Sequence, residues 1–213
     1  MKKMDRLFFV GIFILNGFIA LAQDAGVADQ ISESRNKNIK HLLDFRFKGG
    51  SGEFEKVFFA NVEYTTEARK ACVMGVAIMS FRIDCNNKLS DFRLKNPLGY
   101  GLNEQMGKFF AATEGQWNNC NDEKYTRFEI PILFRIEGTE TGGKGYLIVD
   151  GKYPGFKCKS DAYFLEVFDE LKEKNKSKKA LHALDELMKR DPYNTTYYDM
   201  KKEYLKGDEE DKK

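Results

Sequence analysis

The periodicity of the apolar residues changes from helical to alternating at Val76, and this change sets the fold class. Beyond that point every second residue is apolar along one side of the chain. These positions are Ala77, Met79, Phe81 and Ile83. Such alternation predicts a strand with one buried face. Asp84 to Lys88 is rich in turn-forming residues and Leu89 to Lys95 returns as a second strand, so the segment predicts a β-hairpin.

A third strand is predicted from Tyr125 to Glu137, where apolar and outward positions alternate again. The outward positions are Arg127, Glu129, Pro131, Leu133 and Arg135. Because proline lacks the amide that a sheet ladder uses, Pro131 indicates an edge strand. The unpaired backbone of an edge can accept an incoming peptide, so these five residues are candidates for partner binding. Simple exposure of the strand to solvent fits the pattern equally well.

Helical spacing of apolar residues predicts helices around these strands. They cover 31–43, 52–61, 65–71 and 102–113, and Asn103 is expected to cap the last of them. Together the elements predict an α+β domain in which a small antiparallel three-stranded sheet packs against helices.

The C-terminal third has a different character. Residues 138–160 are rich in glycine and lysine around a short strand-like piece, Tyr146 to Val149, and are interpreted as a connector. Helical periodicity returns at Asp161 and runs through two stripes, and a third helix is expected after Asp191-Pro192. Counted from Asp161, Ala180 and Pro192 stand where a 34-residue tetratricopeptide repeat has its alanine and proline. An ordinary helical hairpin is the alternative, and either should dock on the sheet domain, a second copy or a partner.

The N-terminus has the layout of a secretory signal peptide. Basic residues precede an apolar run, Leu7 to Leu15, and Ala20-Leu21-Ala22 forms a small-residue cleavage site. The apolar segment is short for a membrane span, which needs about 20 residues. We therefore expect cleavage and export, with an inner-membrane anchor facing the periplasm as the alternative. The expected organisation is a signal peptide (1–22), a polar leader (23–43), a sheet domain (44–137), a connector (138–160), a helical unit (161–206) and a charged tail (207–213).

Charge and residue types narrow the function further. Without residues 1–22 the chain would be neutral, with 32 acidic and 32 basic residues, which argues against a nucleic-acid partner. Only two histidines are present and the common hydrolase motifs are missing, so we expect no catalytic residues, no metal site and no cofactor. Four cysteines in an exported chain favour disulfides, and three pairings stay open. If one bridge forms, we expect Cys85 with Cys120.

Several short motifs follow one another between Phe47 and Ile136. They are Phe47 with Gly49 and Gly50, Tyr64 with Ala68, Gly75 with Phe81, Gly99 and Gly101 with Glu104, Trp117, and Pro131-Ile132 with Phe134. In this order and spacing they resemble the C-terminal domain of TonB-type energy transducers, in the variant common in Bacteroidetes.

This resemblance implies a periplasmic protein-binding module associated with TonB-dependent transport. Such a module captures an extended peptide of an outer-membrane receptor, or of another envelope protein, by strand addition. It adds Tyr64 to the partner-binding candidates. Membrane contact is then expected only through partners or an uncleaved N-terminus, and a homodimer is compatible. The alternative is a structural adaptor of the envelope that binds proteins through its tetratricopeptide-like helices.

Overall fold

The computed structural model describes residues 29–120 and 125–210. The predicted signal peptide, residues 1–22, lies outside the described residues. The chain divides after Asn38 into two compact units. In the first, residues 29–38 are helical; the second begins with helical residues 39–46 and contains all the elements below. No helix within the described ranges combines the length and apolar character needed to cross a membrane.

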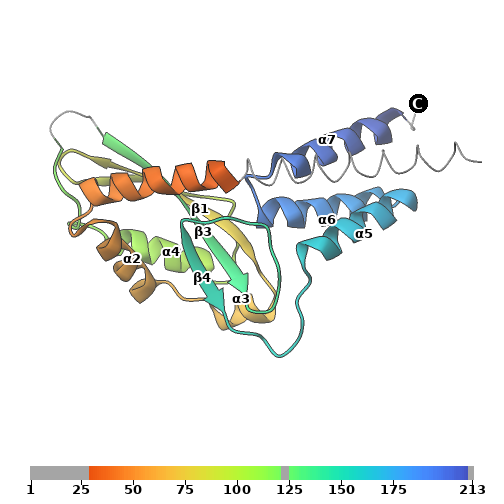
Figure 1. The fold of residues 1–213 in the computed structure, drawn as a ribbon, viewed down its shortest axis with the longest axis horizontal. Coiled ribbons are helices and arrows are strands. Elements are labelled where there is room, and N and C mark those ends of the chain that lie inside the picture. Colours follow the sequence, from red (N-terminus) through yellow and green to blue (C-terminus); the bar gives the residue numbers. More distant parts are fainter. Residues whose placement is uncertain (1–28, 121–124, 211–213) are drawn as a thin grey trace, which may run out of the picture. The chain divides into compact units, whose positions relative to one another are not determined.

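A mixed sheet forms the centre of the second unit. Its strands are β1 (Gly75–Asp84), β2 (Leu89–Lys95), β3 (Tyr125–Ile136) and β4 (Leu147–Gly151), in the order β2-β1-β3-β4 (Figure 1). β1 is antiparallel to both β2 and β3, whereas β4 is parallel to β3. The fold is therefore α+β, but the prediction of a three-stranded antiparallel sheet is wrong. The strand-like piece assigned to the connector is a fourth strand, which the chain reaches only by folding back along β3.

The prediction that β3 is an edge strand is also wrong for its C-terminal half. Ile132 to Phe134 pair with β4 on one side and with β1 on the other, and Arg135 and Ile136 pair with β4 alone. Pro131 stands where the parallel pairing begins: its carbonyl accepts the Tyr146 amide at 2.8 Å, on the β4 side. The nitrogen of Pro131 faces the same side, just before the first pair of the β3–β4 ladder. The sheet therefore loses no hydrogen bond because proline lacks an amide hydrogen. The first half of β3 pairs only with β1.

One face of the sheet is covered by α2 (Gly50–Asn61), α3 (Thr66–Lys70) and α4 (Leu102–Ala112), which share its apolar core. Aromatic rings fill the centre, and Trp117 lies within 6.1 Å of four phenylalanine rings. The expected cap at Asn103 is wrong. Gly101 occupies the cap position with a left-handed φ of 81°, and the Asn103 side chain instead accepts the amides of Leu98 and Gly99. Glycine takes that φ without strain, which explains why it holds this position.

Three helices follow the sheet: α5 (Asp161–Glu173), α6 (Ser177–Arg190) and α7 (Thr195–Glu210). They enclose a second core, in which the helices meet through Phe168, Leu184, Leu187 and Tyr197 among others. The end of α6 docks on the opposite face of the sheet from α2 and α4. A Cβ added at Gly75 would lie 2.5 Å from the Lys189 carbonyl, and one at Gly143 would lie 2.6 Å from the Arg190 carbonyl. Glycine at both positions permits this close approach.

Side chains then hold the helices to the sheet. The Asn96 amide donates to the carbonyls of Val76 and Lys189, both at 2.7 Å. The Arg190 guanidinium pairs with Asp161 at 2.8 Å, and Asp161 also accepts the Gly142 amide at 2.7 Å. The helical unit is therefore docked on the sheet domain through both α6 and the connector.

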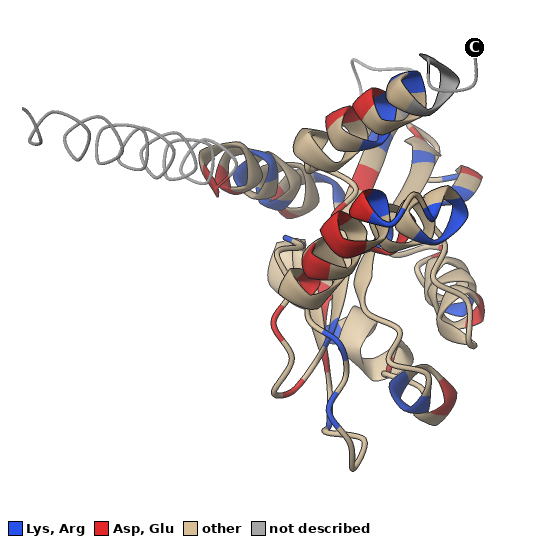
Figure 2. Ribbon diagram, turned by 90° about the vertical axis from the view of Figure 1, so that its right-hand side faces the viewer, with Lys and Arg blue, Asp and Glu red and all other residues tan. Residues whose placement is uncertain are grey.

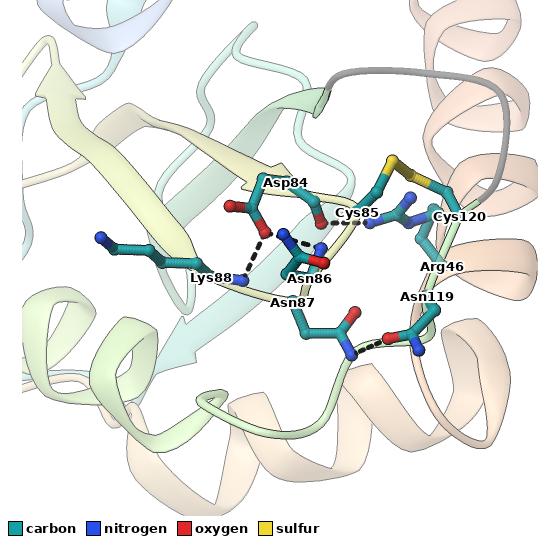
Figure 3. Close-up of a disulfide and its surroundings, with 8 residues drawn as sticks. All are labelled: Arg46, Asp84, Cys85, Asn86, Asn87, Lys88, Asn119 and Cys120. Carbon is teal, nitrogen blue, oxygen red and sulfur yellow. Dashed lines mark hydrogen bonds between the residues drawn. A yellow bond between two sulfur atoms is a disulfide. The ribbon is translucent and has the colours of Figure 1, made fainter.

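Two disulfides close the second unit. One joins Cys72 to Cys158, which ties the end of the connector to the turn before β1. The other joins Cys85, in the β1–β2 turn, to Cys120, the pair named from the sequence. Figure 3 shows this second bridge beside the guanidinium of Arg46, which donates to the Asp84 carbonyl at 3.1 Å. Disulfides of this kind persist in oxidising compartments.

Candidate functional site

The structure separates the five predicted contact residues of β3 into two groups. Arg127 and Glu129 lie in the half that pairs only with β1, and both are exposed. Glu129 forms an ion pair with Lys95 of β2, across β1. These two residues belong to a charged stretch of the sheet face that also contains the Arg82–Asp91 ion pair, at 3.1 Å.

The other half of β3 is covered. Leu133 is buried in a small cluster with Val76 and Ile78, and the connector at Gly143 lies over it. Pro131 is buried as well. Pro131 and Leu133 therefore pack inside this arrangement, and partner contact at these two residues stays a prediction. The connector and α6 create this burial, and neither could be placed from the strand pattern.

Tyr64 is also a packing residue. It is 8% exposed, and its hydroxyl donates to the Val73 carbonyl. Its ring lies edge-on to Phe134, with 5.6 Å between centroids, and a Cβ at Gly151 would come within 2.8 Å of it. Burial raises the pKa of the Tyr64 phenol well above its usual value. Tyr64 therefore packs against Gly151 of β4, and its contact with a partner stays a prediction.

Arg135 forms an ion pair with β4. Its guanidinium binds the Asp150 carboxylate twice, through Nε at 2.5 Å and Nη2 at 3.3 Å. Both side chains remain partly exposed on the outer face of the sheet. This bidentate pair joins β3 and β4 at the position where Arg135 and Asp150 are partners in the sheet.

The structure makes β4 a terminal strand with free backbone groups. The Glu137 amide donates to the Gly151 carbonyl at 2.9 Å, so Gly151 faces β3. Since backbone groups of successive residues point to opposite sides of a strand, Ile148 and Asp150 direct theirs away from β3. Within residues 29–120 and 125–210, no strand pairs with that side of β4. The Ile148 side chain is 38% exposed beside it.

The opposite edge, β2, carries features that discourage strand addition. The register with β1 shifts between Ser80 and Arg82, because Asp91 forms a bulge with a φ of 54°. Exposed Arg93 and Lys95 follow. Bulges and charged side chains at a sheet edge disfavour pairing with a further strand. β4 has no bulge, and its one charged side chain, Asp150, is paired with Arg135, so β4 is the edge better suited to an incoming strand.

The carboxyl ends of β3 and β4 border a shallow hollow of about 650 Å³. Its charged lining consists of Arg135, Glu137, Asp150 and Lys152. These two positive and two negative side chains balance, so the hollow does not favour ions of one sign. It forms a polar surface at the end of the β4 edge. Among the described residues, no group of His, Cys, Asp and Glu has a metal-binding arrangement.

Sequence reasoning missed Ile148 and Asp150. The only signal was the short apolar run from Tyr146 to Val149, which is too brief to distinguish a strand from a connector. A scan against protein-family models finds no match to this chain. Searches of curated proteins and of solved structures also find none.

Proposed function

We propose that this chain is a protein-binding module that captures an extended peptide by adding it as a strand to the free edge of β4. The observation that supports this most directly is the pair of outward-facing backbone units at Ile148 and Asp150. Each offers one amide donor and one carbonyl acceptor to a partner strand. Main-chain hydrogen bonds supply affinity in this mode of recognition, and flanking side chains supply selectivity.

The side chains beside the edge indicate which peptides would fit. A residue opposite Ile148 would lie against its exposed aliphatic side chain, which favours a β-branched or aromatic partner. A residue opposite Asp150 would lie beside a carboxylate that Arg135 already neutralises in part. A polar or basic residue suits this second position, because the Asp150 carboxylate is still largely exposed. The expected peptide therefore alternates one apolar and one polar residue on the outer face.

The proposal also includes the compartment in which the protein acts and the source of the peptide. The motifs from Phe47 to Phe134 support a TonB-like role in the periplasm, with an outer-membrane receptor or another envelope protein as the source of the peptide. The two disulfides support an oxidising compartment.

The test uses two substitutions at one residue. Ile148→Pro removes the outward amide and leaves the ladder to β3 intact, since the Ile148 amide does not face β3. Ile148→Ala keeps the amide and removes most of the side chain. The full chain is immobilised and used to select extended peptides from a display library. We expect the proline variant to weaken binding of the selected peptides about tenfold or more, through one lost donor and an obstructed edge.

The alanine variant controls for the side chain and should retain most of the affinity. Thermal unfolding of both variants checks that the fold persists. If the proline variant binds the selected peptides as tightly as the parent chain, strand addition at β4 is wrong.

A further inference from the structure

The loop that joins β4 to α5 carries large apolar side chains that are exposed to solvent. Tyr153 is 52% exposed and Phe156 is 48% exposed, and Pro154-Gly155 lies between them. Gly155 has a φ of 96°, in the left-handed region that glycine takes without strain in proline-glycine bends. In Figure 1 the loop runs from β4 to α5 beyond the ends of both elements. The two rings therefore lie on either side of one narrow bend.

Both ends of this loop are held by the fold. At its start, the Gly151 carbonyl accepts the Glu137 amide at 2.9 Å within the sheet. At its end, Cys158 is 3% exposed and is bonded to Cys72. Only residues 152–157 lie between these two points. A short loop that is fixed at both ends loses little conformational entropy when it binds a partner.

The charges on this loop all have the same sign. From residue 152 to residue 160 the charged side chains are Lys152, Lys157 and Lys159, and we call residues 152–159 the basic loop. None of the three lysines forms an ion pair with another residue that the structure describes. Lys159 lies over the ring of Tyr163, 4.2 Å from its centroid, and this ring is also 38% exposed. Figure 2 shows blue and tan along the basic loop, at the lower end of the picture.

The acids around the basic loop do not cancel this charge. Asp150 and Asp161, on either side of it in the sequence, are each paired with an arginine. Glu137 lines the same hollow as Lys152 and offsets that lysine. The helices beside the loop add two acids and two bases, which are Glu67, Arg69 and Lys70 in α3 and Glu166 in α5. The end of the loop at Cys158 therefore keeps a positive excess.

We propose that the basic loop docks this protein on a membrane surface that contains anionic lipids. Tyr153 and Phe156 enter the interface between the headgroups and the acyl chains, where aromatic rings are favoured. The lysine side chains are long and flexible, so they extend to the lipid phosphates. This inference goes beyond peptide capture at β4 and concerns a separate surface. It gives the chain membrane contact through its own folded part.

An acidic protein partner fits the basic loop less well. Stable protein interfaces bury about 800 Å² on each side. A loop of six residues around one narrow bend offers only a part of that area. A lipid surface requires no matching shape, and it accepts isolated aromatic rings that are flanked by lysines.

The experiment places a fluorescent reporter in the basic loop. The chain has one tryptophan, Trp117, which is fully buried, and Phe156→Trp adds an exposed one. Emission of the full chain is recorded during titration with vesicles of phosphatidylglycerol and phosphatidylcholine, or of phosphatidylcholine alone. Lipids that are brominated near the headgroup quench a ring that has entered the interface. Because the signal comes from residue 156, binding through another segment does not reproduce it.

We expect a blue shift and quenching with the anionic vesicles, and a much weaker response with phosphatidylcholine alone. In the Phe156→Trp background, Lys157→Gln with Lys159→Gln should weaken binding about tenfold or more. Lys178→Gln with Lys179→Gln removes the same charge from the first turn of α6 and should change binding little.

Sedimentation with the same vesicles tests the rings without the reporter. Tyr153→Ser with Phe156→Ser should weaken binding about tenfold. The control is Phe59→Ser with Tyr100→Ser, which removes two rings of similar exposure, 51% and 55%, from other elements. Thermal unfolding checks that each variant keeps its fold.

Three results would overturn the proposal. They are the lack of a blue shift with anionic vesicles, an equal response to phosphatidylcholine alone, and an equal loss of binding in a control pair. Binding of the full chain to polyglutamate without binding to vesicles would overturn it in favour of an acidic protein partner.

Discussion

Replacing Asp161 by alanine should destabilise this protein far more than its position at the start of a helix suggests. The Asp161 side chain is 13% exposed and the Arg190 side chain 3% exposed, so their ion pair at 2.8 Å is shielded from water. The same carboxylate accepts the Gly142 amide and the Thr141 hydroxyl. One residue therefore joins the start of α5, the end of α6 and the connector.

The magnitude follows from the charge that is left behind. Removing one partner of a buried pair costs about 3 to 5 kcal/mol, because the remaining ion is neither solvated nor paired. The Arg190 guanidinium also stacks over the Phe164 ring, 4.6 Å from its centroid, which recovers only part of that cost. We therefore expect Asp161→Ala to lower the free energy of unfolding by about 3 kcal/mol or more.

A double-mutant cycle in urea at neutral pH measures the coupling. Arg190→Met removes the charge and keeps much of the side-chain volume. The Asp161→Ala and Arg190→Met double variant should be more stable than Asp161→Ala alone, because no unpaired charge remains. Asp185→Ala, which breaks the more exposed pair with Lys201, is the control and should cost less than about 1 kcal/mol. If Asp161→Ala costs no more than this control, the pair does not hold α5, α6 and the connector together.

Two further outcomes test the packing. Replacing Cys72 and Cys158 by alanine should lower stability by about 4 kcal/mol in the loop-entropy model, and more than removal of the second bridge, since 86 residues separate these cysteines and only 35 the others. Denaturant unfolding of both variants measures the order, and the reverse order would contradict it. Tyr64→Phe should cost about 1 to 2 kcal/mol by leaving the Val73 carbonyl without its donor. Calorimetry measures that loss, and weaker peptide binding by a variant that stays folded would contradict the assignment of Tyr64 to the core.

Local structure was predictable wherever a single period ran for several residues. β2 has the bounds Leu89–Lys95 that the alternation and the preceding turn indicate. α5 begins at Asp161, where the helical period returns and where Ser160 accepts the Tyr163 amide as its cap. The bounds of β2 and the start of α5 depend on residues close together in the chain, so both can be predicted from the sequence.

Pairing across the sheet was not predictable in the same way. Pro131 indicates correctly that one amide position is unused, but an edge strand and the start of a parallel ladder satisfy that condition equally. The difference depends on the ten residues after Ile136, which return along the sheet and pair β4 with β3. Glycines at 143 and 145 permit this return by letting the backbone approach Leu133. These two glycines belong to no periodic pattern, so the sequence did not predict that β4 pairs with β3.

The sequence by itself determined the α+β class and most of the segments that are helix or strand. It did so because backbone preference and apolar periodicity act over a few residues. Only the tertiary structure decided that β3 is half covered, that β4 is the free edge, and that Tyr64, Pro131 and Leu133 are buried. These facts depend on contacts between segments far apart in the chain, where close approach of glycine backbones and a shielded ion pair select one arrangement among several that the pattern permits.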